Sequence, residues 1–237
     1  MKIIIIGATS GLGRGTAELF AQAGHQVGIT GRRMELLEEM QSRYPNHISV
    51  ETMDVTADNC VLQLESLIGK MQGVDIILYS SGIGKASETI DYTIENETNK
   101  VNVYGFTQLI DYAYNYFIEQ GHGHLSVISS VAGFRGLRGA PSYCASKGYQ
   151  RLYMESLAQT AHRCKHKIRF STIIPGFVDT DLLKGQNYPL TLSCKKAVRI
   201  IYKALLRKKR TIYVDGRWRY IVFFMKRIPI YIWERML

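Results

Sequence analysis

The chain has 237 residues, of which 46% are hydrophobic, so it can bury one substantial core but is too short for two full domains. Its net charge of +10 is concentrated at one end, since residues 195–237 contain thirteen Lys or Arg and two Asp or Glu. A basic segment confined to one end does not indicate a nucleic-acid-binding surface, so we expect no nucleic-acid partner. The sequence contains no run of about twenty uncharged apolar residues that could form a membrane-spanning helix.

The first apolar run, residues 3–6, is too short for a signal peptide and meets a glycine turn, which predicts a cytoplasmic location. The four cysteines are widely spaced and form no C-x-x-C pair, which favours reduced thiols over a disulfide framework. His122 and His124, and the pair His162 and His166 around Cys164, could be imagined as metal ligands. A second well-spaced pair of ligands is missing nearby, so we predict no metal site.

Short apolar runs rich in Ile and Val alternate with amphipathic stretches along the chain. The apolar runs predict buried strands at residues 2–7, 26–30, 48–53, 74–79, 125–129, 168–174 and 211–214. Helical periodicity predicts helices at residues 14–23, 35–44, 59–71, 95–119, 143–164 and 193–206. The alternation predicts an α/β fold, in which helices cover both faces of a Rossmann-like parallel sheet, as one domain over residues 1–237.

A glycine-rich turn joins the first predicted strand to the first predicted helix. Its sequence, G-A-T-S-G-L-G, spaces the glycines as G-x-x-x-G-x-G. Glycine lets the backbone turn tightly and approach a pyrophosphate, whose charge is favoured at a helix N-terminus. A tight turn without a ligand is the alternative. The dinucleotide hypothesis gives cofactor contacts to Gly7, Thr9, Ser10, Gly11, Leu12 and Gly13.

The second predicted strand leads into Gly31, about twenty residues after the glycine turn, where an NAD-binding enzyme would place an acid on the ribose 2′-hydroxyl. Arg32 and Arg33 stand there instead, and their guanidinium groups suit a 2′-phosphate, which favours NADP(H). The alternative is a pair of solvated loop charges. Asp54 and Val55, at the end of the third strand, could lie against the adenine, although Asp is also a common turn residue.

A phenol and an ammonium group lie four residues apart at Tyr143 and Lys147, on one face of a predicted helix. A Y-x-x-x-K match alone is expected by chance in a chain with 15 tyrosines, so its position supplies the weight. The pair follows the strand at residues 125–129, and the turn after that strand carries Ser130.

With these motifs the chain resembles the short-chain dehydrogenase/reductase family, from its start to about residue 215. That family has, in this order, a glycine turn, a catalytic Asn, a Ser thirteen residues before the Tyr, and the Y-x-x-x-K pair. The matching residues are Gly7, Gly11, Gly13, Asn102, Ser130, Tyr143 and Lys147. A Pro-Gly segment after the sixth strand also matches, and it implies cofactor contacts from Pro175, Gly176, Val178 and Thr180. The resemblance implies a doubly wound sheet of seven strands.

Hydride transfer to a carbonyl places negative charge on the substrate oxygen, which needs a hydrogen-bond donor and then a proton. Tyr143 could supply the proton and Ser130 the hydrogen bond, while Lys147 would lower the pKa of the phenol. The resemblance further implies that Lys147 holds the nicotinamide ribose and that Asn102 holds a water for proton relay. We therefore expect an NADPH-dependent carbonyl reductase that is a homo-oligomer and acts on an apolar ketone or alcohol.

Two other functions stay open. The reaction could run as an alcohol dehydrogenase on a hydroxysteroid-like or lipid substrate. The chain could also be a non-catalytic NADP(H)-binding protein that senses redox state, because a fold alone does not specify an activity.

One segment departs from the family pattern. After the fourth strand the family usually has Asn-Asn-Ala-Gly, whereas this chain has Tyr79, Ser80, Ser81 and Gly82. We expect Gly82 to keep a cofactor contact, while the way in which the sheet centre is braced stays open.

The C-terminal tail, residues 217–237, is basic and aromatic, and its apolar residues recur at helical spacing. Pro229 should break or kink a helix there. The tail could lie in a membrane interface, where aromatic rings sit at headgroup level and Lys or Arg meet anionic lipid. It could instead pack on the protein's own core or on a partner subunit and close the substrate pocket. The short loop at residues 181–192 favours an open pocket.

Overall fold

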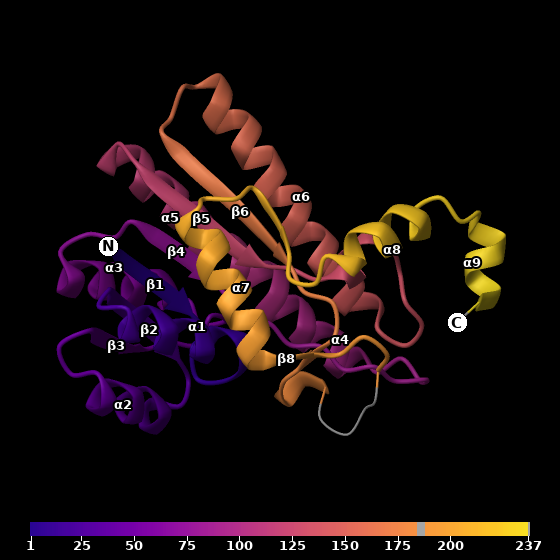
Figure 1. Ribbon diagram of the computed structural model, residues 1–237, viewed down its shortest axis with the longest axis horizontal. Helices are drawn as coiled ribbons and strands as arrows, with labels where there is room; N and C mark the ends of the chain where they lie inside the picture. The colour runs from indigo at the N-terminus through magenta and orange to yellow at the C-terminus, as the bar shows by residue number, and fades with distance from the viewer. Residues whose placement is uncertain (184–187, 237) are drawn as a thin grey trace.

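A parallel sheet of seven strands forms the centre of the computed structural model, which describes residues 1–183 and 188–236 (Figure 1). The strand order is β3-β2-β1-β4-β5-β6-β9. β2 and β3 are added on one side of β1, and β4 and the later strands on the other side, as in a doubly wound sheet. The predicted Rossmann-like α/β fold is therefore confirmed. The strands are β1 (Lys2–Ile6), β2 (Gln26–Gly31), β3 (Ile48–Thr52), β4 (Ile76–Tyr79), β5 (Gly123–Ile128), β6 (Ile168–Ile174) and β9 (Thr211–Tyr213).

Helices cover both faces of the sheet, and the first strand shows how the sequence fits this arrangement. Ile3 and Ile5 pack with residues of α1, α2 and α7, whereas Ile4 and Ile6 pack with residues of α3, α5 and α6. All four side chains are fully buried, because successive residues of a strand point to opposite faces and here both faces are covered. These helices are α1 (Gly11–Gln22), α2 (Met34–Arg43), α3 (Cys60–Met71), α5 (Phe106–Gln120), α6 (Pro141–Arg163) and α7 (Cys194–Leu206).

The helix predicted at residues 95–119 is divided in three. It forms α4 (Tyr92–Asn99), a π-helical turn η1 (Lys100–Gly105) and then α5. A Cβ atom at Gly105 would collide with the backbone carbonyl of Val55. The glycine therefore allows η1 to pack directly against the backbone that follows β3. The remaining predicted elements differ from the observed bounds by no more than three residues at either end.

Short elements that the sequence did not indicate join the main ones near the carboxyl ends of the strands. They are η2 (Val131–Phe134), β7 (Val178–Asp179), η3 (Asp181–Leu183) and β8 (Leu192–Ser193). Residues 184–187 lie outside the described residues, so the expectation that the loop at 181–192 leaves an open pocket is not tested there.

The tail forms α8 (Arg217–Met225) and α9 (Ile230–Met236), which extend away from the sheet at the right of Figure 1. Pro229 lies between the two helices, as predicted. Trp218 and Val222 of α8 are buried against Val131, whereas α9 buries none of its described residues. Within residues 1–183 and 188–236, the helices are all too short or too polar to cross a bilayer.

The glycine turn between β1 and α1 generates a stability prediction. A Cβ atom at Gly13 would collide with the backbone carbonyl of Gly7, whereas one at Gly69 on the exposed side of α3 meets nothing within 4 Å. We expect Gly13→Ala to lower the free energy of unfolding by roughly 1–3 kcal/mol, and Gly69→Ala to raise it by roughly 0.5–1 kcal/mol. Urea unfolding of the two variants and the wild type measures this, and equal midpoints for both variants would contradict the close approach.

Candidate active site

The glycine turn leaves the start of α1 open to a ligand. Gly7 and Gly11 have φ angles of +89° and +56°, a region that suits glycine. Ser10 is the N-cap residue of α1, but its side chain makes no capping hydrogen bond. The first N–H groups of α1 thus face outward without a side-chain acceptor at the N-cap, which is the arrangement that suits a phosphate.

The unusual segment after β4 fits closely against this turn. A Cβ atom at Gly7 would collide with the side chain and backbone of Ser81, and one at Gly13 would lie 2.9 Å from Ser80 Oγ. Tyr79 is fully buried and its hydroxyl donates to the Val101 carbonyl at 2.7 Å. The sheet centre is therefore braced by a phenol that connects β4 to η1 and by two small hydroxyl residues at the glycine turn.

Both arginines after β2 lie near other candidate cofactor residues. Arg33 Nη2 donates to Thr9 Oγ1 in the glycine turn at 2.8 Å. Arg32 is close enough to Asp54 to act on its pKa. Burial favours a higher pKa for that carboxyl, but two hydrogen bonds from Thr56 and the charge of Arg32 together leave it below its usual value. The guanidinium group of Arg33 thus lies at the glycine turn, and that of Arg32 lies near Asp54.

Lys147 is buried at the carboxyl end of β5. Its side chain is 5% exposed, and Nζ donates to the Ile128 carbonyl at 2.9 Å and to Gln150 Oε1 at 3.1 Å. A Cβ atom at Gly82 would lie 3.0 Å from Nζ, so the glycine leaves space beside the ammonium group. Burial lowers the pKa of Lys147 to about 7, because the charged form loses its hydration.

Tyr143 lies one helical turn before Lys147, with Lys147 Nζ 5.9 Å from the centre of its ring. A Cβ atom at Gly84 would collide with the ring, so the backbone after β4 packs directly on it. Burial raises the pKa of the phenol, and a hydrogen bond with Ser130 opposes the rise. The lowering expected from Lys147 is not found, because a lysine with a pKa of about 7 is only partly charged at neutral pH.

Asn102 lies in the π-helical turn and is fully buried. Its side-chain amide accepts from the Ile83 N–H at 2.9 Å and donates to the Ile83 carbonyl at 2.7 Å and to Ser146 Oγ at 3.0 Å. Its backbone carbonyl accepts a hydrogen bond from Gln150 Nε2 at 2.9 Å. Gln150 thus bonds Asn102, the residue to which the family resemblance assigns a water for proton relay.

The segment after β6 lies across from the glycine turn. The Pro175 carbonyl accepts from the Val131 N–H at 3.0 Å, which ties this segment to the turn that carries Ser130. The methyl group of Thr180 would lie 3.7 Å from a Cβ atom at Gly11. Val178 is buried in β7. A Cβ atom at Gly176 would collide with the Trp218 indole, so the tail packs directly on this segment.

Two clusters therefore emerge from the candidate residues. One contains Ser130, Tyr143, Lys147, Asn102 and Gly82, and the other contains the glycine turn with Arg33, while Arg32 lies near Asp54. Val55 is 7% exposed and packs in the core beneath η1. Sequence reasoning missed Gln150, whose signal was a polar residue three positions after Lys147 on the same helix face.

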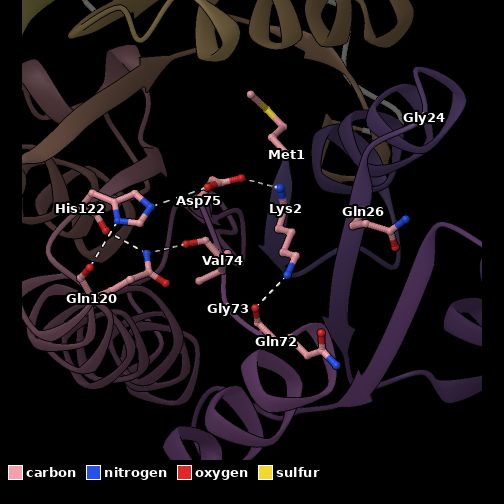
Figure 2. Close-up of a pocket in the computed structure, with 10 residues that line it drawn as sticks. All are labelled: Met1, Lys2, Gly24, Gln26, Gln72, Gly73, Val74, Asp75, Gln120 and His122. Atoms are coloured by element: carbon pink, nitrogen blue, oxygen red, sulfur yellow. Dashed lines mark hydrogen bonds and ion pairs between the residues drawn. The ribbon is translucent and has the colours of Figure 1, made fainter.

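A separate hollow lies at the amino ends of the strands, the end of the sheet opposite the candidate site. Its volume is about 370 Å³, and Figure 2 shows Lys2, Asp75 and His122 among its lining residues. The Lys2 N–H donates to Asp75 Oδ2 at 2.7 Å, and His122 Nε2 lies 3.9 Å from Asp75 Oδ1. The hollow is at the amino ends of β1 and β4, and the candidate residues do not line it. Ligands of doubly wound sheets bind at the carboxyl ends of the strands, so this hollow is not the candidate site.

Comparisons with known proteins agree with this geometry. A sequence model of the family described as short chain dehydrogenase matches residues 1–189. An uncharacterized oxidoreductase of Myxococcus xanthus is 31% identical over 212 residues, which is 86% of this chain and 83% of the relative.

Solved structures of low sequence identity share the fold. A short chain dehydrogenase/reductase from Burkholderia phymatum in complex with NAD has a TM-score of 0.84 at 17% identity and covers 93% of this chain and 91% of its own. A short chain dehydrogenase from Burkholderia cenocepacia in complex with NADP has a TM-score of 0.84 at 19% identity and covers 100% and 97%. On the family match and the sequence relatives together, the chain belongs to the short chain dehydrogenase family, whose members are oxidoreductases.

Proposed function

We propose that the protein is an NADPH-dependent reductase that transfers hydride to an apolar ketone, with Tyr143 as the proton donor. The proposal rests mainly on one observation, which is that Ser130, Tyr143 and the buried Lys147 form one cluster. A dinucleotide fits the residues present, since the start of α1 lacks a side-chain cap and Gly82 leaves space beside the Lys147 ammonium group. The bound nicotinamide would supply the hydride.

The chain's own residues would handle the charge and the proton. Tyr143 would donate its proton to the substrate oxygen, and Ser130 would donate a hydrogen bond to the same oxygen. A high pKa suits Tyr143 to the role of acid, because the phenol stays protonated until negative charge develops beside it. Lys147 would hold the ribose and, when charged, stabilise the phenolate that remains after proton transfer.

NADP(H) is proposed over NAD(H) because of charge. Arg33 contacts Thr9 in the glycine turn, and Arg32 lies near Asp54. Guanidinium groups bind phosphate oxygens in a forked geometry, whereas an acid would be expected at this place for a free ribose hydroxyl. Of the two solved structures described above, one binds NAD and the other NADP, so the fold does not decide between the cofactors. The preference for NADP(H) is therefore proposed from the two arginines.

An apolar substrate is proposed because aromatic side chains surround the segment after β6. Phe177 stacks on Tyr188 with ring centres 4.1 Å apart, and the Trp218 ring stands edge-on to Phe177 at 5.4 Å. Such a wall favours apolar groups near the reacting carbon. The alcohol dehydrogenase direction uses the same residues in reverse.

The second candidate, a redox sensor without catalysis, is disfavoured by Tyr143 and Ser130. Binding of the cofactor alone needs no phenol and hydroxyl held together beside the buried Lys147. The cytoplasmic location and the homo-oligomeric state remain predictions.

Replacing the proposed acid tests the reaction. We expect Tyr143→Phe to reduce kcat by about 100-fold or more, because the hydroxyl is the proton donor, while the Kd for NADPH changes little. NADPH oxidation with a series of ketones of graded chain length measures the rate, and fluorescence titration measures the binding. Tyr149→Phe is the matched control, since Tyr149 lies on the same helix as Tyr143 but its hydroxyl is 2.8 Å from Thr107 Oγ1 of α5. Near wild-type turnover in Tyr143→Phe would refute the assignment.

Replacing both arginines tests the cofactor. We expect Arg32→Ala with Arg33→Ala to weaken NADPH binding by about 10- to 100-fold, since charge-assisted hydrogen bonds to the 2′-phosphate are lost. The Kd for NADH should change by less than about threefold, because NADH lacks that phosphate. Equal losses for the two cofactors would show that the arginines serve the fold or the pyrophosphate instead.

We also propose that the outer face of the tail contacts an anionic membrane surface. The inner face of α8 packs on the protein, but α8 and α9 together expose seven large apolar side chains: Tyr220, Phe223, Phe224, Ile230, Tyr231, Ile232 and Met236. Arg219, Lys226 and Arg227 are exposed between them. Positive charge interleaved with aromatic rings matches an interface with anionic headgroups better than the face of a second, equally basic copy.

Vesicle sedimentation tests this surface. We expect the full-length protein to pellet with vesicles that contain phosphatidylserine, about fivefold less at high salt, and to stay in solution with phosphatidylcholine alone. Phe223→Ser with Phe224→Ser should abolish pelleting, whereas Leu62→Ser, which removes an exposed apolar side chain on α3, should not. If the double variant instead abolishes a dimer and vesicles never bind, the face belongs to a second copy.

A further inference from the structure

Gln150 connects two residues of the candidate site. It lies on α6, three residues after Lys147, and is fully buried. Its Nε2 donates to the backbone carbonyl of Asn102 at 2.9 Å, and its Oε1 accepts from Lys147 Nζ at 3.1 Å. Both ends of the buried amide are thus bonded, and each end faces a residue that the family resemblance assigns to the reaction.

The orientation of this amide is fixed by its neighbour. The Asn102 carbonyl can only accept a hydrogen bond, so the NH₂ end of Gln150 must face it and the oxygen must face Lys147. Asn102 is itself held, because its side-chain amide bonds both backbone groups of Ile83 and Ser146 Oγ. The acceptor presented to the lysine therefore stands on a fixed support.

The ammonium group has three N–H donors, and the structure accounts for two of them. One goes to the Ile128 carbonyl at the end of β5 and one to Gln150. Gly82 leaves the neighbouring space without a side chain. The two acceptors therefore direct the third N–H away from the helix core and toward that space.

We propose that Gln150 is a positioning residue that holds the Lys147 ammonium group in the direction in which it binds the cofactor ribose. The proposal rests on the proposed function for the ribose contact, but the contact between Gln150 and Lys147 is independent of it. The amide supplies an acceptor without a negative charge, so it orients the lysine and leaves its charge sensitive to pH.

The surroundings of Lys147 support this sensitivity. Burial alone lowers its pKa to about 7, with no contribution from a charged neighbour. Tyr143 on the same helix is the titratable group beside it. Ile128 of β5 and Gly82 of the segment after β4 lie beside Nζ, and Asn102 of η1 is connected to it through Gln150; none of these residues carries a charge. A carboxylate at position 150 would add a negative charge beside Lys147 and raise its pKa, and an apolar side chain would remove the hydrogen-bond acceptor.

The test compares Gln150→Leu and Gln150→Glu with the wild type. Selective ¹³C labelling of lysine allows the Lys147 Cε signal to be titrated by NMR, with Lys147→Met identifying the signal. We expect Gln150→Leu to lower the pKa of Lys147 by about one unit and Gln150→Glu to raise it by about one to three units. Gln120→Leu is the matched control, because it removes amide hydrogen bonds to the Val74 and His122 carbonyls far from the site.

The same variants are then measured for NADPH binding and for the pH dependence of kcat/KM. A lysine is charged below its pKa, so we expect the high-pH loss of activity to move to lower pH in Gln150→Leu and to higher pH in Gln150→Glu. Gln150→Leu should also weaken NADPH binding by about tenfold, whereas Gln150→Glu, which keeps the acceptor, should bind NADPH within about threefold of the wild type.

Two results separate the possible failures. If the Lys147 signal titrates at the same pH in all of these variants, Gln150 only fills space and the inference is wrong. If the NMR shifts occur but no ketone is reduced by the wild type, the contact stands and the proposed reductase activity fails. Should Gln150→Leu not fold, Gln150→Glu has nearly the same shape and still decides the question.

Discussion

Burial of one ammonium group constrains the whole active-site end of the sheet. Lys147 can remain inside only because fixed acceptors replace its hydration, and these come from the end of β5 and from its own helix. α6 must therefore dock tightly on the turn after β5. Ser129 Oγ donates to the Lys147 carbonyl at 2.8 Å, and a Cβ atom at Gly133 would lie 2.6 Å from the Lys147 backbone. The small residues Ser129 and Gly133 in that turn thus allow α6 to approach closely enough to place the lysine.

The segment after β4 shows that the same architecture can be braced in another way. The Tyr79 hydroxyl reaches from β4 to the carbonyl of Val101, next to the residue that holds Gln150. Both carbonyls belong to the π-helical turn: that of Val101 accepts from Tyr79 of β4, and that of Asn102 accepts from Gln150 of α6. π-Helical turns are often found at functional sites. They leave backbone groups available that a regular α-helix would use in its own hydrogen bonds.

The sequence predicted the sheet, its covering helices and the family, because runs of β-branched residues and the spaced glycine, serine, tyrosine and lysine motifs are local signals. It did not predict the π-helical turn, since one extra residue in a continuous amphipathic stretch hardly changes the pattern. Nor could it predict the role of Gln150 or the pKa of Tyr143. Both depend on depth of burial and on neighbours from other elements, and a polar residue on a helix face gives no local sign of either.

The tail is joined to the turn that follows Ser130. Arg135 Nη1 donates to the Met225 and Ile228 carbonyls at 2.5 and 2.6 Å, and Trp233 Nε1 donates to the Gly136 carbonyl at 2.8 Å. If the turn has two conformations that differ in these contacts, a partner of the tail can prefer one of them, and so can a substrate. When both prefer the same conformation, binding of the substrate raises the affinity for the partner by thermodynamic linkage. Binding at the tail would then change the affinity for substrate, and binding of substrate would change the affinity at the tail by the same factor.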